Sequence, residues 1–255
     1  MDIARISDLL APFLRGPIAV PENSSHTEPK PCHPEAAKAR EGSAALSPAQ
    51  LQDISTYIDI LLRWNARINL TAVRNPESIV TRHFGESLFA ARHLFPQSSS
   101  VPSASSVVNA FEPSAPNVPI TLADIGSGAG FPGLPIKLWA PHLSLTLIES
   151  NHKKAAFLRE ITRALRLTDV NIQNQRAEDL TGDRFDVVTL RAVERFETAL
   201  PIAASLVAPA GRISLLIGAS QRGPAQASLP QFLWSEPVQI PSSSVRILLT
   251  GHRHS

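Results

Sequence analysis

Three glycines spaced two residues apart are the part of this sequence best suited to chemistry. Gly126, Gly128 and Gly130 follow the strand-like run Thr121-Leu-Ala and the acid Asp124, and a helical pattern comes next. A strand, a tight turn and a helix in this order form the first half of a nucleotide-binding βαβ unit. Glycine permits positive φ and brings the backbone close to a ligand, because it has no Cβ. The alternative is an ordinary glycine-rich turn between a strand and a helix.

The spacing of these glycines separates two classes of nucleotide site. A dinucleotide-binding fingerprint places a glycine at position 131, where this chain has Phe131. The pattern acid-x-Gly-x-Gly-x-Gly is instead typical of class I methyltransferases that use S-adenosylmethionine (SAM). We therefore predict SAM as the cofactor, bound by Asp124, Gly126, Gly128, Gly130 and Phe131.

Further candidates follow the other predicted strands, because the ligand of an α/β sheet lies outside the carboxyl ends of its strands. Glu149 ends the second strand, where a carboxylate can accept both hydroxyls of a ribose. Its alternative role is an acid favoured by the dipole of the next helix. Ala177 and Glu178 follow the third strand and either recognise an adenine edge or form a solvated turn. Arg191 follows the fourth strand, where it faces the methionine carboxylate or the acceptor, or ties down a loop through carbonyl groups.

The elements after the glycine loop alternate between strand and helix. Strands are predicted at 143–149, 170–174, 185–190 and 212–217, helices at 153–166 and 196–207, and a closing antiparallel pair at 238–240 and 245–250. This alternation favours a mostly parallel sheet with helices on both faces. The predicted fold is therefore α/β, of the class I SAM-dependent methyltransferase (Rossmann-like) type. It has a mostly parallel sheet with antiparallel closing strands, preceded by a helical N-terminal region.

Four segments are expected along the chain. Residues 1–45 hold a short helix at 3–14 and a disordered insertion, because 16–45 shows no apolar periodicity. Residues 46–96 form the helical N-terminal region, with a capping box at Ser47-Pro-Ala-Gln50 and a second helix start at Asn75-Pro76. Residues 97–119 form a flexible Ser/Pro-rich insertion, and residues 120–255 form the SAM-binding methyltransferase domain.

The composition predicts a globular protein without disulfides or a metal. Hydrophobic residues make up 43% of the chain, and the net charge of +2 leaves room for a modest basic face but no polybasic tail. The single Cys32 excludes an internal disulfide and a cysteine zinc site, and its neighbour His33 is interpreted as incidental. The sequence shows neither a membrane-spanning run nor a signal peptide, so we expect a cytoplasmic protein without a membrane partner.

Three blocks of the sequence resemble RsmG (GidB), the bacterial small-subunit ribosomal RNA methyltransferase G family. The first block joins Trp64-Asn-Ala-Arg-Ile-Asn-Leu-Thr71 to Arg82-His-Phe-Gly-Glu-Ser-Leu88 and is specific to the family. The second is the more generic Asp124–Pro135, and the third joins Arg176-Ala-Glu178 to Leu190-Arg-Ala-Val193. The resemblance implies methyl transfer from SAM to N7 of a guanine in 16S ribosomal RNA of the small subunit, near the decoding region.

The resemblance also implies roles for single residues. Phe131 packs beside the cofactor, Ala177 and Glu178 meet its adenine end, and Gly126 and Arg191 complete the cofactor contacts. Two positions depart from the family pattern. Glu86 stands where the family usually has Asp, and Ile217 stands where it has a lysine, which removes a positive contact to the substrate.

No catalytic residue is predicted. Guanine N7 carries a lone pair and no proton, so its methylation needs no general base. Catalysis then reduces to orientation, which supplies about 7–11 kcal/mol in favourable cases. Access to N7 requires a loop or an extruded nucleotide, because the deep major groove of A-form RNA hides this atom.

Arg67, Arg82 and His83 are the predicted RNA contacts, since they precede the sheet and lie outside the strand ends that build the cofactor site. Their alternative role is to fix a helix onto the sheet, which burial would favour. Two other functions stay open. A SAM-dependent methyltransferase of a small molecule predicts a closed apolar pocket over the sheet. A non-catalytic SAM-binding ribosome-assembly factor predicts binding of SAM without turnover.

Overall fold

The computed structural model describes residues 1–15, 45–97, 119–191 and 196–254. The insertions predicted at 16–45 and 97–119 fall outside these ranges apart from their edges. The helices are α1 (Ile3–Leu14), α2 (Pro48–Asn65), α3 (Pro76–Ile79), the π-helical η1 (Val80–Gly85), α4 (Glu86–Leu94), α5 (Gly133–Trp139), α6 (His152–Ala164), the 3₁₀ turn η2 (Ala177–Asp179), α7 (Phe196–Ser205), the 3₁₀ turn η3 (Ala219–Gln221) and α8 (Arg222–Ser228). The strands are β1 (Thr121–Ile125), β2 (Ser144–Ile148), β3 (Val170–Gln173), β4 (Phe185–Arg191), β5 (Val207–Gly218), β6 (Phe232–Trp234), β7 (Val238–Gln239) and β8 (Arg246–Arg253).

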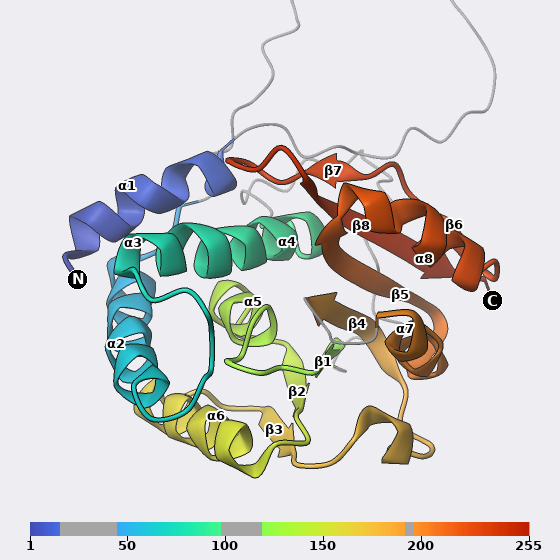
Figure 1. The fold of residues 1–255 in the computed structure, drawn as a ribbon, viewed down its shortest axis with the longest axis horizontal. Coiled ribbons are helices and arrows are strands. Elements are labelled where there is room, and N and C mark those ends of the chain that lie inside the picture. Colours follow the sequence, from blue (N-terminus) through green and yellow to red (C-terminus); the bar gives the residue numbers. More distant parts are fainter. Residues whose placement is uncertain (16–44, 98–118, 192–195, 255) are drawn as a thin grey trace, which may run out of the picture.

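The strands form one sheet in the order β3-β2-β1-β4-β5-β8-β6, with β7 also paired to β8 (Figure 1). The pairings from β3 through to β5 are parallel, and β8 runs antiparallel to β5, β6 and β7. This arrangement confirms the predicted mostly parallel sheet with antiparallel closing strands. The order reverses at β1, which pairs with β2 on one side and β4 on the other, so the sheet has its topological switch point beside the glycine loop.

Successive residues of β1 feed two hydrophobic cores on opposite faces of the sheet, as the period of two in a strand requires. Leu122 belongs to a core shared with α1, α2, α4, α5 and α6, whereas Ala123 belongs to a core shared with α7 and α8. The N-terminal helices, together with α5 and α6, therefore cover one face of the sheet, and α7 and α8 cover the other (Figure 1).

The N-terminal helices begin where the sequence predicts them. In α2 the Ser47 hydroxyl accepts a hydrogen bond from the Gln50 N–H, and the Gln50 side chain accepts one from the Ser47 N–H, which confirms the capping box. The Asn75 side chain caps α3. The predicted helix from Asn75 to about Leu94 is interrupted by the π-helical turn η1, which carries Arg82 and leads directly into α4. Such turns are frequent at functional sites.

The main differences from the prediction lie near the C-terminus. The sequence did not predict α8 or β6, and β5 begins at Val207 rather than at residue 212. The register of β4 against β5 shifts after Phe185, and Ala210 in β5 adopts a positive φ of 58°. The first half of β5 is therefore irregular and lacks a regular strand pattern in the sequence. The helix that follows the glycine loop, α5, begins at Gly133. None of the described helices has the length and apolar character that a membrane crossing requires.

Candidate active site

The glycine loop after β1 has the backbone that the sequence predicts. Gly126, Gly128 and Gly130 have φ values of 65°, 56° and 85°, a region that glycine enters without steric cost. The Gly126 and Ser127 N–H groups both donate to the Ile148 carbonyl, at 2.9 and 3.1 Å. These bonds fix the loop to the end of β2, so it has a defined shape at the carboxyl edge of the sheet.

Asp124 lies beneath the loop and is fully buried. One carboxyl oxygen accepts a hydrogen bond from the Gly133 N–H at 3.1 Å, and the other accepts one from the Thr189 hydroxyl at 2.9 Å. Burial raises the pKa of Asp124 to about 7, against the opposing effect of these hydrogen bonds. All the contacts of this carboxyl group are internal, and they tie the loop to α5 and β4. Its predicted contact with the cofactor stays a prediction.

Glu149 stands at the rim of the loop, just past β2. Its two carboxylate oxygens accept hydrogen bonds from the Gly128 N–H at 2.9 Å and the Asn151 N–H at 2.8 Å. Asn151 is the N-cap of α6, so Glu149 is also close to the start of that helix. The structure thus brings Glu149 and Gly128 together, as a cofactor site requires, and is equally consistent with the helix-terminal role.

Ala177 and Glu178 lie in η2, which follows β3. Ala177 packs against the core on the face of α7 and α8, and Glu178 is exposed with an ion pair to Arg176 at 3.4 Å. Because β3 pairs with β2, this turn stands at the same edge of the sheet as Glu149. The position agrees with the predicted adenine end, which stays a prediction.

An aromatic cluster joins the glycine loop to the N-terminal helices. The Phe131 ring stacks on Tyr57 with ring centroids 5.5 Å apart and on His83 at 4.9 Å, and Phe84 meets its edge. The Tyr57 hydroxyl donates to the Ala129 carbonyl at 2.5 Å. The resemblance places the Phe131 ring beside the cofactor, but here the ring is buried among helix residues. Tyr57, which the sequence analysis did not select, holds the loop from the opposite element.

A buried cluster of charges lies beside the end of β4. Glu86 accepts hydrogen bonds through a single oxygen from Arg191 at 2.9 Å and from Arg246 at 3.0 Å. Arg191 also donates to the Arg82 carbonyl at 2.6 Å, so it ties the end of β4 to the helical turn η1. Its predicted contact with the cofactor stays a prediction. Glu86 is therefore the centre of the cluster. Arg246 was not predicted from the sequence, because it is distant from Glu86 and Arg191 in the chain.

The predicted RNA contacts divide into two groups. Arg67 and Arg82 are exposed, whereas His83 is buried and bonds to the Thr71 hydroxyl at 2.7 Å. Burial, together with the charges of Arg191, Arg82 and Arg246, lowers the pKa of His83 to about 3. These contacts favour the structural role for His83. The exposed side chains of Arg67 and Arg82 agree with a role in binding, which stays a prediction.

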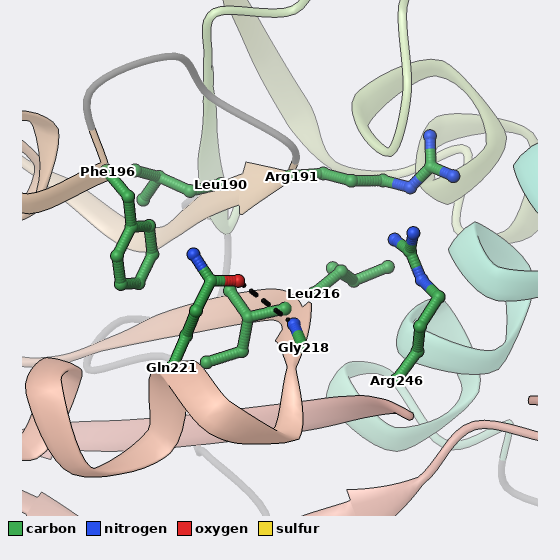
Figure 2. A pocket seen from close by; sticks show the side chains of 8 residues that line it. Leu190, Arg191, Phe196, Leu216, Gly218, Gln221 and Arg246 are labelled. Atoms are coloured by element: carbon green, nitrogen blue, oxygen red, sulfur yellow. Dashed lines mark hydrogen bonds between the residues drawn. The ribbon is translucent and has the colours of Figure 1, made fainter. Parts of the chain in front are cut away.

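A pocket of about 170 Å³ opens at the carboxyl ends of β4 and β5. Figure 2 shows the guanidinium groups of Arg191 and Arg246 near one another at one side, with Phe196 and Gln221 at the other. The remaining lining is mostly apolar, formed by Leu190, Leu216, Ile217 and Gly218. Ile217 is buried in the strand core, so the residue that replaces the usual lysine forms part of the apolar floor.

The chain matches a family model described as rRNA small subunit methyltransferase G over residues 50–245. It belongs to this family. The matched range includes the glycine loop, Glu86, Arg191 and all of η3, whereas Arg246 lies one residue beyond it. It also agrees with the resemblance noted in the sequence.

Curated members of the methyltransferase G family align with most of the chain. The protein from Chloroflexus aggregans is 36% identical over 217 residues, which are 80% of this chain and 82% of the relative. The Bacillus subtilis protein is 34% identical over 71% of this chain and 69% of its own length. A crystal structure of ribosomal protein L11 methylase from Lactobacillus delbrueckii subsp. bulgaricus has a TM-score of 0.52 and 14% identity, over 68% of this chain and 79% of that chain. This last likeness concerns the fold alone, which is the class I SAM-dependent methyltransferase fold.

Proposed function

We propose that this chain transfers the methyl group of SAM to N7 of a guanine in 16S ribosomal RNA, near the decoding region. The observation that carries the proposal is the family match, which spans both the glycine loop and the Glu86–Arg191 pair. The relatives are named ribosomal RNA small subunit methyltransferase G, and one of them aligns with 80% of the chain. A small-subunit RNA substrate follows from this relationship.

The loop fits SAM. A Cβ built on Gly128 would approach only the Gly126 carbonyl, at 3.7 Å, so space is open at the tip of the loop. Glu149 stands at that tip, and each of its oxygens has spare capacity for a ribose hydroxyl beyond the single N–H that it accepts. Ala177 and Glu178 would meet the adenine end from the next strand. SAM supplies an electrophilic methyl group, and the loop residues bind and orient it.

The acceptor chemistry fits a site without a general base. His83 lies near the arginine cluster, but its lowered pKa of about 3 and its burial make it a poor proton acceptor. Guanine N7 has no proton to lose, so the site needs only to hold this atom in line with the methyl group. We assign this positioning to the walls of the pocket beside β4. The rate enhancement then comes from the orientation of N7 toward the methyl group.

The RNA would reach this pocket over the helical N-terminal region. Arg67 and Arg82 present exposed cations there, and cations on phosphates provide affinity that falls with salt. Arg82 belongs to the same π-helical turn as His83, next to the Glu86 cluster, so a phosphate on it would lie beside the pocket. The small ribosomal subunit is the proposed partner, which implies action in the cytoplasm.

The test is methyl transfer to small ribosomal subunits that lack this methyl group. Purified protein is incubated with subunits and SAM labelled in the methyl group, and the RNA is digested to nucleosides. We expect label in 7-methylguanosine with the wild type and none with Gly128→Val. Label in a small molecule but not in RNA would favour the small-molecule enzyme, and SAM binding without turnover would favour the assembly factor.

A further inference from the structure

The pocket between β4, β5 and η3 has the size and position of an acceptor-base site. Its volume of about 170 Å³ is below the roughly 300–1,000 Å³ of sites that enclose drug-sized ligands, so it suits one planar ring system rather than a whole nucleotide. It opens beside β4, whose other neighbour is β1, the strand that leads into the glycine loop. A base in this pocket would therefore lie one strand away from the methyl donor's loop.

The orientation of the Gln221 amide is fixed by its contacts. Its side-chain oxygen accepts a hydrogen bond from the Gly218 N–H at 3.0 Å, and a backbone N–H can donate only to the oxygen of an amide. The NH₂ group of Gln221 therefore occupies the other position, which Figure 2 shows on the side of Leu190. Within the described part of the chain this NH₂ group has no acceptor, so it is available to a ligand as a hydrogen-bond donor.

The other polar groups at the pocket are also donors. Arg191 and Arg246 contain no acceptor atoms, and Glu86 holds both guanidinium groups through one oxygen. The Nε atom of Arg246 is buried and has no acceptor among the residues that the structure describes. The floor formed by Leu216 and Ile217 and the wall formed by Phe196 offer apolar surface to the faces of a ring.

A pocket that offers donors selects a base edge that carries acceptors. Guanine presents two neighbouring acceptors, O6 and N7, whereas adenine has an amino donor at the position of O6. N7 must keep its lone pair free for methylation, so O6 is the atom left for recognition. We infer that this pocket receives the acceptor guanine and that the Gln221 amide, with Arg246, donates to O6 and so determines the choice of guanine over adenine. The inference rests on the proposed function, because it assigns the acceptor site of that reaction.

Gln221→Glu is the variant that tests this assignment most narrowly. Glutamate keeps the oxygen that accepts from the Gly218 N–H but replaces the donating NH₂ group with a second oxygen. Gln226→Glu is the matched control, since it makes the same chemical change on α8, outside the pocket lining. We expect Gln221→Glu to lower kcat/KM on small subunits about tenfold or more, as loss of a base-reading contact does, with SAM affinity near the wild-type value. We expect Gln226→Glu to retain wild-type kcat/KM.

A second measurement uses only the wild-type protein, so it does not depend on how the variant folds. Small subunits are reconstituted with 16S RNA that carries 2-aminopurine, which has N7 but lacks O6, at the target position. We expect 2-aminopurine to be methylated at least tenfold more slowly than guanine. Equal rates on the two bases, or equal rates for Gln221→Glu and Gln226→Glu, would overturn the assignment while leaving the proposed function intact. Failure of the wild type to methylate guanine N7 at all would instead refute the proposed function.

Discussion

Replacing Glu86 with glutamine should cost the protein a large part of its stability. The Glu86 carboxylate forms ion pairs with Arg191 and Arg246. The exposed fractions of the three side chains are 4% for Glu86, 8% for Arg191 and 22% for Arg246. Glutamine keeps the length of the side chain and one oxygen but removes the negative charge. Two guanidinium groups would then face each other without compensation, and removing one partner of a buried pair costs about 3–5 kcal/mol. Most of this loss should come from Arg191, because Arg246 keeps more contact with water.

Urea denaturation followed by circular dichroism measures this loss. With a slope m of about 1–3 kcal/mol per molar urea, a loss of this size lowers the midpoint by roughly 1 M or more. Glu77→Gln is the control, because Glu77 pairs with Arg5 at 2.8 Å on the surface, where both side chains are about half exposed. Exposed pairs contribute little. Equal midpoints for Glu86→Gln and Glu77→Gln would show that the buried cluster does not stabilise the fold, and the reasoning would be wrong.

Three further predictions address the loop, the buried acid and the RNA contact. Gly128→Val should abolish SAM binding, as measured by calorimetry, because valine disfavours a φ of 56° and fills the open space of the loop. A folded variant with unchanged SAM affinity would contradict this. Burial raises the pKa of Asp124 from 3.8 to about 7, so the free energy of unfolding of the wild type should fall as the pH rises through this window. Asp124→Asn should make the urea midpoint depend less on pH. An equal dependence on pH in the two proteins would refute this prediction. Arg82→Ala should reduce the methylation of small subunits and make this methylation depend less on salt. SAM affinity and Tm should stay near the wild-type values, since the Arg82 side chain is exposed. A lower Tm would instead show that Arg82 has a structural role.

Local signals in the sequence predicted the elements well. The positive φ at the three loop glycines, the capping box at Ser47 and the order of parallel strands all rest on residues close in the chain. The segment from Arg222 to Trp234 was missed because Arg222-Gly-Pro is a poor start for a helix and β6 has only three residues. The π-helical turn before Glu86 has no distinct period and was read as ordinary helix.

The long-range contacts within the site could not be predicted from the sequence. The ion pair of Glu86 with Arg246 joins the start of α4 to the start of β8, and only the fold brings these residues together. The sequence predicted Phe131 as a cofactor contact, which stays a prediction. Its ring packs on Tyr57 and His83, because α2 and η1 cover that face of the sheet. The burial of His83 follows from the same covering helices, and a periodic pattern alone does not distinguish a buried histidine from an exposed one.

Mapping the modified base in cells tests whether this protein methylates guanine N7 in 16S ribosomal RNA. A bacterial strain that lacks its own member of this family is complemented with the wild-type chain or with Gly128→Val, and 16S ribosomal RNA is cleaved chemically at 7-methylguanosine. We expect cleavage at a single guanine near the decoding region with the wild type and no cleavage with Gly128→Val. Expression of the folded wild type without any 7-methylguanosine in the 16S RNA would contradict this expectation.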